Sequence, residues 1–158
     1  MTALKSLLFL IFVPGLLAVY IPLAFLTEGT RIPTGVFAYL AFPFWFIGGS
    51  TLLWCFWDFL VKGKGTPAPI DPPKELVVTG LYRYVRNPMY VGVILTLMGH
   101  FLWFQTVSII VYGLFFFVVA HLFVTGYEEP HLKKVFGAAY EDYVKKVPRW
   151  LPHLKKRS

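Results

Sequence analysis

Two segments of this chain carry side chains whose types and spacing suit the binding of a charged small molecule. One is residues 76–90, which read Leu-Val-Val-Thr-Gly-Leu-Tyr-Arg-Tyr-Val-Arg-Asn-Pro-Met-Tyr, and the other is the acidic pair Glu128-Glu129. Asn followed by Pro is typical of a helix start, where free backbone N–H groups bind carboxylates. A carboxylate pair beside a long apolar run is costly to desolvate unless it is paired, so it suits a cation such as an amino group or a sulfonium.

These side chains also have structural interpretations, which stay open at this point. Arg83, Arg86 or nearby lysines would neutralise the acidic pair, or the pair would simply face water. Tyr82, Tyr84 and Tyr90 would either stack on an adenine or pack at a membrane interface. We predict no metal site, because no two histidines have the spacing of metal ligands and the chain has one cysteine.

The composition indicates which elements position these residues. Hydrophobic residues make up 57% of the 158 positions and charged residues 15%, with a mean hydropathy of +0.63. These values exclude a disordered chain and argue against an ordinary soluble protein. The net charge of +7 is typical of a cytoplasmic membrane face, so we predict a bilayer rather than nucleic acid as its partner.

The apolar stretches predict about four transmembrane helices of roughly 20 residues each. Residues 7–26 and 35–61 form the first two, with a secretory signal as the alternative interpretation of the first. The Pro-rich connection 62–86 faces water. Residues 87–127 contain no Lys, Arg, Asp or Glu and are too long for one span, so we predict a tight hairpin with its turn near residues 100–105. Such a hairpin brings residues 76–90 and the acidic pair to the same side.

The last segment, residues 128–158, has the pattern of an amphipathic helix on the cytoplasmic face. Pro130 begins this helix and Pro148 ends it. Its apolar stripe consists of Leu132, Val135, Phe136, Ala139, Tyr140, Tyr143, Val144 and Val147. Every Lys and Arg except Arg31 lies at the N-terminus, in 62–86 or in 128–158, which places both termini in the cytoplasm. The predicted fold is thus an all-α, integral membrane domain spanning residues 1–158.

The order and spacing of several motifs resemble the isoprenylcysteine carboxyl methyltransferase family and the wider group of membrane phospholipid methyltransferases. The resemblance covers residues 74–152. It rests on the motifs at residues 76–82 and 86–92, Glu128-Glu129, Phe136-Gly137, Tyr140, Tyr143 and Val147-Pro148.

The resemblance implies an integral membrane methyltransferase that takes S-adenosylmethionine from the cytoplasm and its acceptor from the lipid. It also implies that the C-terminal amphipathic helix closes over the cofactor pocket. The cofactor-binding residues that it implies are Lys74, Glu75, Leu76, Val77, Tyr82, Arg86, Asn87, Pro88, Met89, Tyr90 and Glu128.

Two positions depart from the family pattern. Asn87 stands where the family often has His; it can still cap a helix and donate a hydrogen bond, but it cannot serve as a titrating base. Val124 stands where prenylcysteine enzymes have an Arg that meets the substrate carboxylate, and valine cannot replace a planar cationic fork. The resemblance implies a lipophilic acceptor, and Val124 disfavours a prenylcysteine carboxylate, so a phospholipid, another small molecule or a prenylated compound stays open.

The acceptor decides whether the reaction needs a proton acceptor. A carboxylate needs none, whereas an amine, thiol or phenol must lose a proton, and Glu129 and His121 are the local candidates for this catalytic role. The alternative to an enzyme is a non-catalytic membrane binding or scaffold protein, which the identities of Asn87 and Val124 favour. A transporter is disfavoured, because the spans lack paired charges and a visible inverted repeat.

Overall fold

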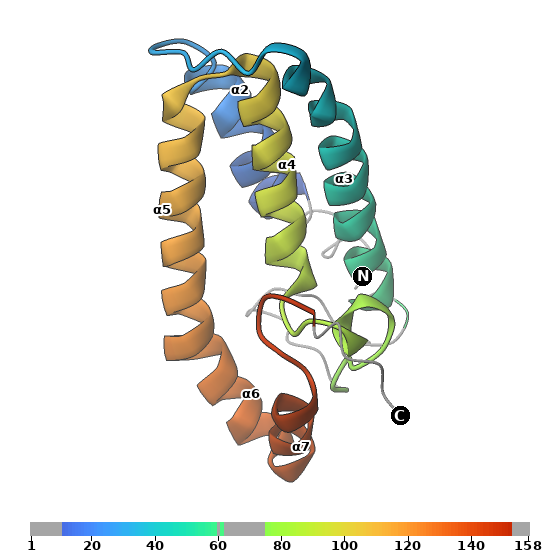
Figure 1. The fold of residues 1–158 in the computed structure, drawn as a ribbon. Helices are drawn as coiled ribbons and strands as arrows, with labels where there is room; N and C mark the ends of the chain where they lie inside the picture. The colour runs from blue at the N-terminus through green and yellow to red at the C-terminus, as the bar shows by residue number, and fades with distance from the viewer. Residues whose placement is uncertain (1–10, 60, 62–74, 153–158) are drawn as a thin grey trace.

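The computed structural model describes residues 11–59, 61 and 75–152, and this part of the chain is helical without a β-strand, as predicted. Its elements, where η marks 3₁₀ or π turns, are η1 (Ile11–Tyr20), α2 (Ile21–Phe25), η2 (Gly35–Leu40), α3 (Ala41–Asp58), η4 (Gly80–Arg83), α4 (Pro88–Phe104), α5 (Val107–Phe123), η5 (Val124–Glu128), α6 (Glu129–Phe136) and α7 (Ala138–Lys146). Helix α4 lies between α3 and α5, while α6, α7 and residues 75–87 gather at one end of the bundle (Figure 1).

Two helices of the described chain are long and apolar enough to cross a membrane, Gly35–Asp58 and Val107–Phe136. Only 11% and 22% of the residues in their most apolar windows are buried, whereas the core helix of a soluble protein would be covered. The apolar helices Phe12–Phe25 and Pro88–Phe104 are shorter. The all-helical architecture is therefore confirmed, and four spans with cytoplasmic termini stay a prediction.

The predicted helical hairpin is formed by α4 and α5, which are joined at Gln105 and Thr106. Gln105 adopts a left-handed conformation with φ 62° and ends α4, and the buried Thr106 donates its hydroxyl to the Leu26 carbonyl at 2.7 Å. The turn thus lies at the last residue of the predicted range and one beyond. His100 belongs to α4, where Nδ1 accepts a hydrogen bond from Trp45 Nε1 at 2.8 Å.

Close contact between α3 and α4 fixes the position of α4 along the axis of the bundle. A Cβ atom at Gly48 would lie 2.6 Å from Thr96 Oγ1, and one at Gly99 would lie 2.5 Å from the Trp45 ring. Both glycines are therefore required by packing rather than by backbone conformation. This contact holds the start of α4 at the end of the bundle where α6 lies (Figure 1), and Asn87 and Tyr90 belong to this start.

The C-terminal segment differs from the predicted single surface helix. Helix α6 continues α5 through the π turn η5, so Pro130 does not begin a separate helix. A proline ring clashes with the carbonyl four residues earlier in a helix, and for Pro130 this carbonyl lies inside η5. The wider π turn leaves room for the ring. Gly137, with φ 52°, then separates α6 from α7, and α7 ends at Lys146, before Pro148.

The apolar stripe of this segment is partly as predicted. Tyr140, Tyr143 and Val147 form a buried cluster, against which Leu132, Phe136 and Leu76 pack. The other predicted members, Val135, Ala139 and Val144, are exposed, because the break at Gly137 turns α7 relative to α6 and interrupts the helical periodicity. The cluster nevertheless docks the C-terminal segment onto residues that precede α4.

Candidate functional site

The connector before α4 and the acidic pair after α5 meet at one end of the bundle, as the hairpin predicted. The Tyr90 hydroxyl donates a hydrogen bond to Glu128 Oε2 at 3.1 Å, and Arg86 Nη1 lies 2.9 Å from Glu129 Oε1. Both contacts join the start of α4 to the region where α5 passes into α6. Residues 76–90 and the acidic pair therefore lie together, as the methyltransferase interpretation of the sequence requires.

A cavity of about 100 Å³ lies at this junction. We call the part lined by Tyr82, Arg86, Asn87, Tyr90 and Glu128 its polar end, where Phe59 and Met89 pack beside Tyr82, and the part lined by Val13, Pro14, Leu17, Val93 and Phe116 its apolar end. Ligand pockets for whole drug-sized molecules begin at roughly 300 Å³. This space therefore suits the reacting end of a ligand, with one polar and one apolar side.

Glu128 gives the polar end a negative charge. Among the described residues it accepts a hydrogen bond from Tyr90, and no described Lys or Arg forms an ion pair with it. A carboxylate at an apolar cavity with only a phenol as its partner is incompletely compensated. A bound cation would compensate it, so the polar end favours a ligand with a positive centre.

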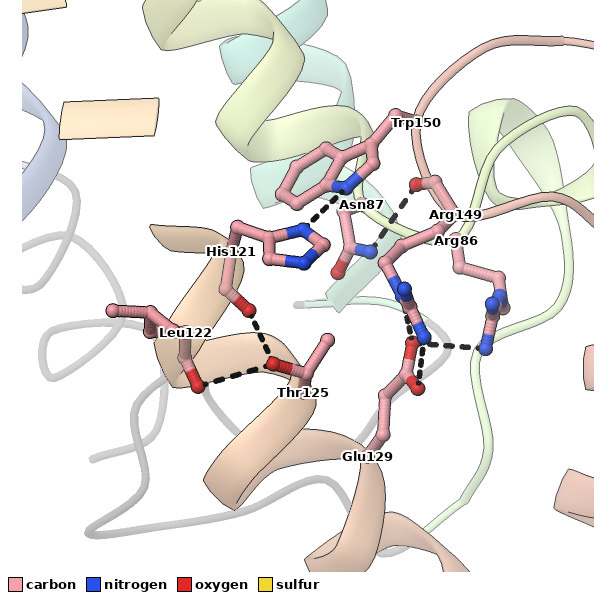
Figure 2. A network of polar contacts seen from close by, with 8 residues as sticks. All are labelled: Arg86, Asn87, His121, Leu122, Thr125, Glu129, Arg149 and Trp150. Atoms are coloured by element: carbon pink, nitrogen blue, oxygen red, sulfur yellow. Dashed lines mark hydrogen bonds and ion pairs between the residues drawn. The ribbon is translucent and has the colours of Figure 1, made fainter. Parts of the chain in front are cut away.

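Glu129, the next residue, is compensated by two guanidinium groups (Figure 2). Arg149 donates from Nε to Glu129 Oε1 at 2.7 Å and from Nη2 to Oε2 at 2.9 Å, a bidentate pair. The contact from Arg86 is an ion pair by distance, and Arg86 Nη1 makes no well-aligned hydrogen bond there. Both oxygens of Glu129 are thus engaged, and its side chain does not line the cavity.

The π turn η5 separates the roles of these two neighbours. Its backbone is wider than an α-turn, and such turns occur often at functional sites. The Thr125 hydroxyl donates to the His121 carbonyl at 2.8 Å and so satisfies a carbonyl beside the irregular turn (Figure 2). Glu128 consequently lines the cavity, while Glu129 reaches the segment after α7.

That segment, residues 147–150, is called the strap here, and backbone contacts tie it to the start of α4. The Arg86 amide donates to the Pro148 carbonyl at 2.8 Å, and Asn87 Nδ2 donates to the Arg149 carbonyl at 3.2 Å. Asn87 occupies the N-cap position of α4, as predicted, but its side chain makes no capping hydrogen bond. The side-chain amide instead orients the strap (Figure 2).

Tyr143 of α7 and Tyr82 of η4 contact each other at the same end. The Tyr143 hydroxyl donates to the Tyr82 carbonyl at 2.7 Å, and both residues are buried. Burial raises the pKa of Tyr82 and of Tyr143 above the ordinary value. Both phenols therefore stay neutral, and Tyr82 presents an uncharged wall to the cavity.

His121 and Trp150 form a separate contact beside the cavity. Trp150 Nε1 donates to His121 Nδ1 at 3.2 Å, and Phe117 lies against both rings, with centroids 5.3 Å from Trp150 and 6.2 Å from His121. Because the indole only donates, a neutral His121 carries its proton on Nε2. Tyr90 also contacts Trp150 edge to face, with centroids 6.2 Å apart, which connects this group to the cavity.

The structure brings together six of the predicted cofactor residues, namely Tyr82, Arg86, Asn87, Met89, Tyr90 and Glu128. Four others do not line the cavity: Glu75 is exposed, Leu76 packs on the Tyr143 cluster, Val77 packs beside Cys55 and Tyr82, and Pro88 is buried at the start of α4. Lys74 lies outside the described residues. The Val124 side chain is fully buried.

Two pairs of residues at this site were not predicted from the sequence. Arg149 and Trp150 received no role in the sequence interpretation, although an Arg-Trp pair directly after Pro148 is a signal for an ordered segment. Val13 and Leu17 were assigned only to a span. No cluster of three His, Cys, Asp or Glu side chains that would hold a metal occurs among the residues that the structure describes.

Comparison with known proteins agrees with this arrangement. A family model described as phospholipid methyltransferase matches residues 36–139, which include α3, α4, α5 and the acidic pair. The protein-S-isoprenylcysteine O-methyltransferase of Schizosaccharomyces pombe is 38% identical over 78 residues. That alignment covers 49% of this chain and 33% of the relative, so it spans about a third of the relative's length. The family model covers well over half of the chain, and the chain belongs to the phospholipid methyltransferase family.

Proposed function

We propose that this chain is an S-adenosylmethionine-dependent methyltransferase whose acceptor is a hydrophobic molecule dissolved in the membrane. The observation that carries this proposal is the cavity, which has Glu128 at a polar end and apolar helices at the other. Membership of the family and the name of the yeast relative support a methyl transfer. The excess of basic residues at this end supports a cytoplasmic donor site.

Glu128 would hold the positive centre of the donor in this proposal. Tyr90 fixes the carboxylate by its hydrogen bond, and Arg86 and Asn87 present donors from the segment before α4 to polar groups of the nucleoside. The bound cofactor would supply an activated methyl group on a sulfonium. The cavity volume suits the sulfonium end and the incoming acceptor atom rather than the whole cofactor.

The residues around the cavity align the reactants and exclude water. Methyl transfer is an in-line displacement in which the positive charge on sulfur disappears, so an apolar closed site does not oppose it. Buried, neutral Tyr82 and the apolar Met89 and Val93 provide such walls.

The two candidate proton acceptors have different surroundings. Both oxygens of Glu129 are held by arginines, so we assign it a positioning role for Arg86 and the strap. His121 remains our candidate for an amine, thiol or phenol acceptor, and Trp150 orients its ring. Val124 is buried and offers no cation for a carboxylate acceptor, so we propose an acceptor that is not recognised through a carboxylate at this position.

Calorimetry on protein in lipid nanodiscs tests the donor site. We expect the wild type to bind S-adenosylmethionine and S-adenosylhomocysteine. Glu128→Gln should weaken S-adenosylmethionine binding at least about tenfold, equivalent to about 1.4 kcal/mol, and should weaken S-adenosylhomocysteine binding less, because its sulfur is neutral. Glu141→Gln, which removes an exposed carboxylate outside the cavity, is the matched control and should change neither affinity.

Two outcomes would contradict the proposal at different levels. A folded wild-type protein that binds neither compound would exclude a methyltransferase of this kind. Normal binding by Glu128→Gln would keep the enzyme but remove Glu128 from the donor site. A panel of a prenylcysteine analogue, phosphatidylethanolamine, a quinol-like phenol and an alkyl thiol, assayed with methyl-labelled donor, then identifies the acceptor class.

A further inference from the structure

The apolar end of the cavity is walled by the N-terminal helix. Val13, Pro14 and Leu17 of η1 face Val93 of α4 and Phe116 of α5 across it. The family match begins at residue 36, so η1 lies outside the region that carries the family pattern. The cavity therefore has a polar end built from matched residues and an apolar end completed by a helix that the match does not include.

This apolar end is closed on one side and reaches the surface on the other. At the closed side, Ala18, Val93 and Leu97 form a buried cluster with Tyr112 and Phe116 packed against it. The Tyr112 hydroxyl donates to the Leu17 carbonyl at 2.9 Å, which fixes η1 against α5 at that level. The cavity consequently ends at this cluster and does not run through the bundle.

At the other side, Val13 lines the cavity and is also 40% exposed. Its neighbours Phe12 and Leu16 are exposed as well. An opening that is rimmed by exposed apolar side chains on apolar helices faces hydrocarbon rather than water. A molecule that enters at Val13 therefore comes from the lipid.

We propose that the η1 wall receives the hydrocarbon chain of the methyl acceptor, and that Val13 and Leu17 determine which acceptors the protein uses. This inference rests on the proposed function and adds to it the acceptor side of the cavity. The occupant is a single chain, because the cavity holds only about 100 Å³ and is shared with the reacting group. A chain that enters at Val13 and lies with its tail against Leu17, at the closed side, leaves its head group toward the Tyr90–Glu128 end.

The test uses a hexadecanethiol probe with a diazirine at the end of its chain, in nanodiscs of phosphatidylcholine. Irradiation and peptide mass spectrometry locate the labelled residues, and excess hexadecanethiol without the diazirine separates saturable binding from general contact with lipid. Leu17→Trp fills the cavity, and Val13→Trp narrows its opening. Leu16→Trp places the same side chain on the neighbouring exposed position, which does not line the cavity.

We expect saturable labelling of residues 12–18 or 116 in the wild type and in Leu16→Trp. Leu17→Trp or Val13→Trp should reduce it at least about tenfold, the loss expected when about two methylene groups are no longer buried. Thermal melting of each variant shows that it is folded, and a folded Val13→Trp suffices if Leu17→Trp does not fold. Labelling that is not saturable, or that is equal in all variants, overturns the inference.

The proposed function is judged separately in the same samples. Binding of S-adenosylhomocysteine reports the donor end, and we expect the wild type and Leu16→Trp, whose side chain lies outside the cavity, to have the same affinity within about twofold. If the wild type binds S-adenosylhomocysteine but shows no saturable labelling, the donor site stands and the η1 wall does not receive the chain. If saturable labelling occurs without donor binding, the proposed function fails and the η1 site remains as a site for a hydrocarbon chain.

Discussion

Glu129→Gln is expected to loosen the strap and lower the stability of the protein. In the wild type, both carboxylate oxygens accept well-placed hydrogen bonds from Arg149, at 2.7 and 2.9 Å, and Arg86 contributes an ion pair (Figure 2). The substitution keeps the shape of the side chain and one acceptor oxygen. It removes the charge, leaves a buried Arg86 without its counter-ion, and places an amide donor against a guanidinium.

The size of the effect follows from these contacts. A hydrogen bond to a charged group contributes about 1.5–3 kcal/mol, and one of the two bonds from Arg149 is lost. The side chain of Arg149 is 31% exposed and that of Glu129 18%, so solvent compensates part of the loss. We therefore expect a destabilisation of about 2 kcal/mol, which corresponds to a fall in Tm of about 4–8 °C for a chain of this size.

Thermal unfolding in one detergent, followed by tryptophan fluorescence, measures this effect. The matched control is Glu141→Gln. It also removes a carboxylate from an ion pair, with Lys133 at 2.8 Å, but both of those side chains are largely exposed. Water screens such a pair, so the control should show no resolvable change in Tm.

A double-mutant cycle with Arg149→Gln separates the pair from other consequences of each substitution. If the strap is held as described, the double variant should be little less stable than either single variant. A wild-type Tm in Glu129→Gln, or additive losses in the cycle, would show that the Glu129–Arg149 contact does not hold the strap and would refute this reasoning.

Three further predictions concern the packing around the site. Tyr143→Phe should lower the free energy of unfolding by about 1 kcal/mol, because it removes the hydrogen bond to the Tyr82 carbonyl. A fall in Tm measures this loss. Gly48→Ala should cost about 1–3 kcal/mol, because its Cβ would meet Thr96 Oγ1 at 2.6 Å, whereas Gly49→Ala has open space and should be neutral or stabilising in the same assay. Because the pKa values of Tyr82 and Tyr143 are raised, the folded protein keeps protons that the unfolded chain releases near pH 10.0. The free energy of unfolding should therefore fall as the pH rises above that value. Tyr143→Phe should make this fall less steep, and an unchanged slope would contradict the assignment.

The helices could be predicted from the sequence because membrane spans are defined by length and composition alone. An uncharged run of the length of 87–127 leaves few alternatives to a hairpin, and its consequence, the meeting of residues 76–90 with the acidic pair, followed directly. The continuation of α5 into α6 could not be predicted in this way. Pro130 normally indicates a helix start, and the π turn that accommodates it has no clear sequence signal.

The polar end of the site was predictable for a similar reason, since Tyr82, Arg86, Asn87, Tyr90 and Glu128 lie in two contiguous segments. The roles of Glu128 and Glu129 were not, because only the backbone geometry of η5 decides which carboxylate lines the cavity. Arg149 and Trp150 belong to an irregular strap that has no periodic pattern. The contribution of Val13 and Leu17 depends on which helices pack together, which hydropathy does not specify.

A structure of the protein with bound S-adenosylhomocysteine, determined by electron cryomicroscopy in nanodiscs, tests the central claim most directly. We expect the cofactor sulfur to lie in the cavity beside Tyr90 and Glu128, with the opening at Val13 free for the acceptor. A cofactor located elsewhere, for example in the groove between α6 and α7 lined by Lys133 and Tyr140, would contradict it.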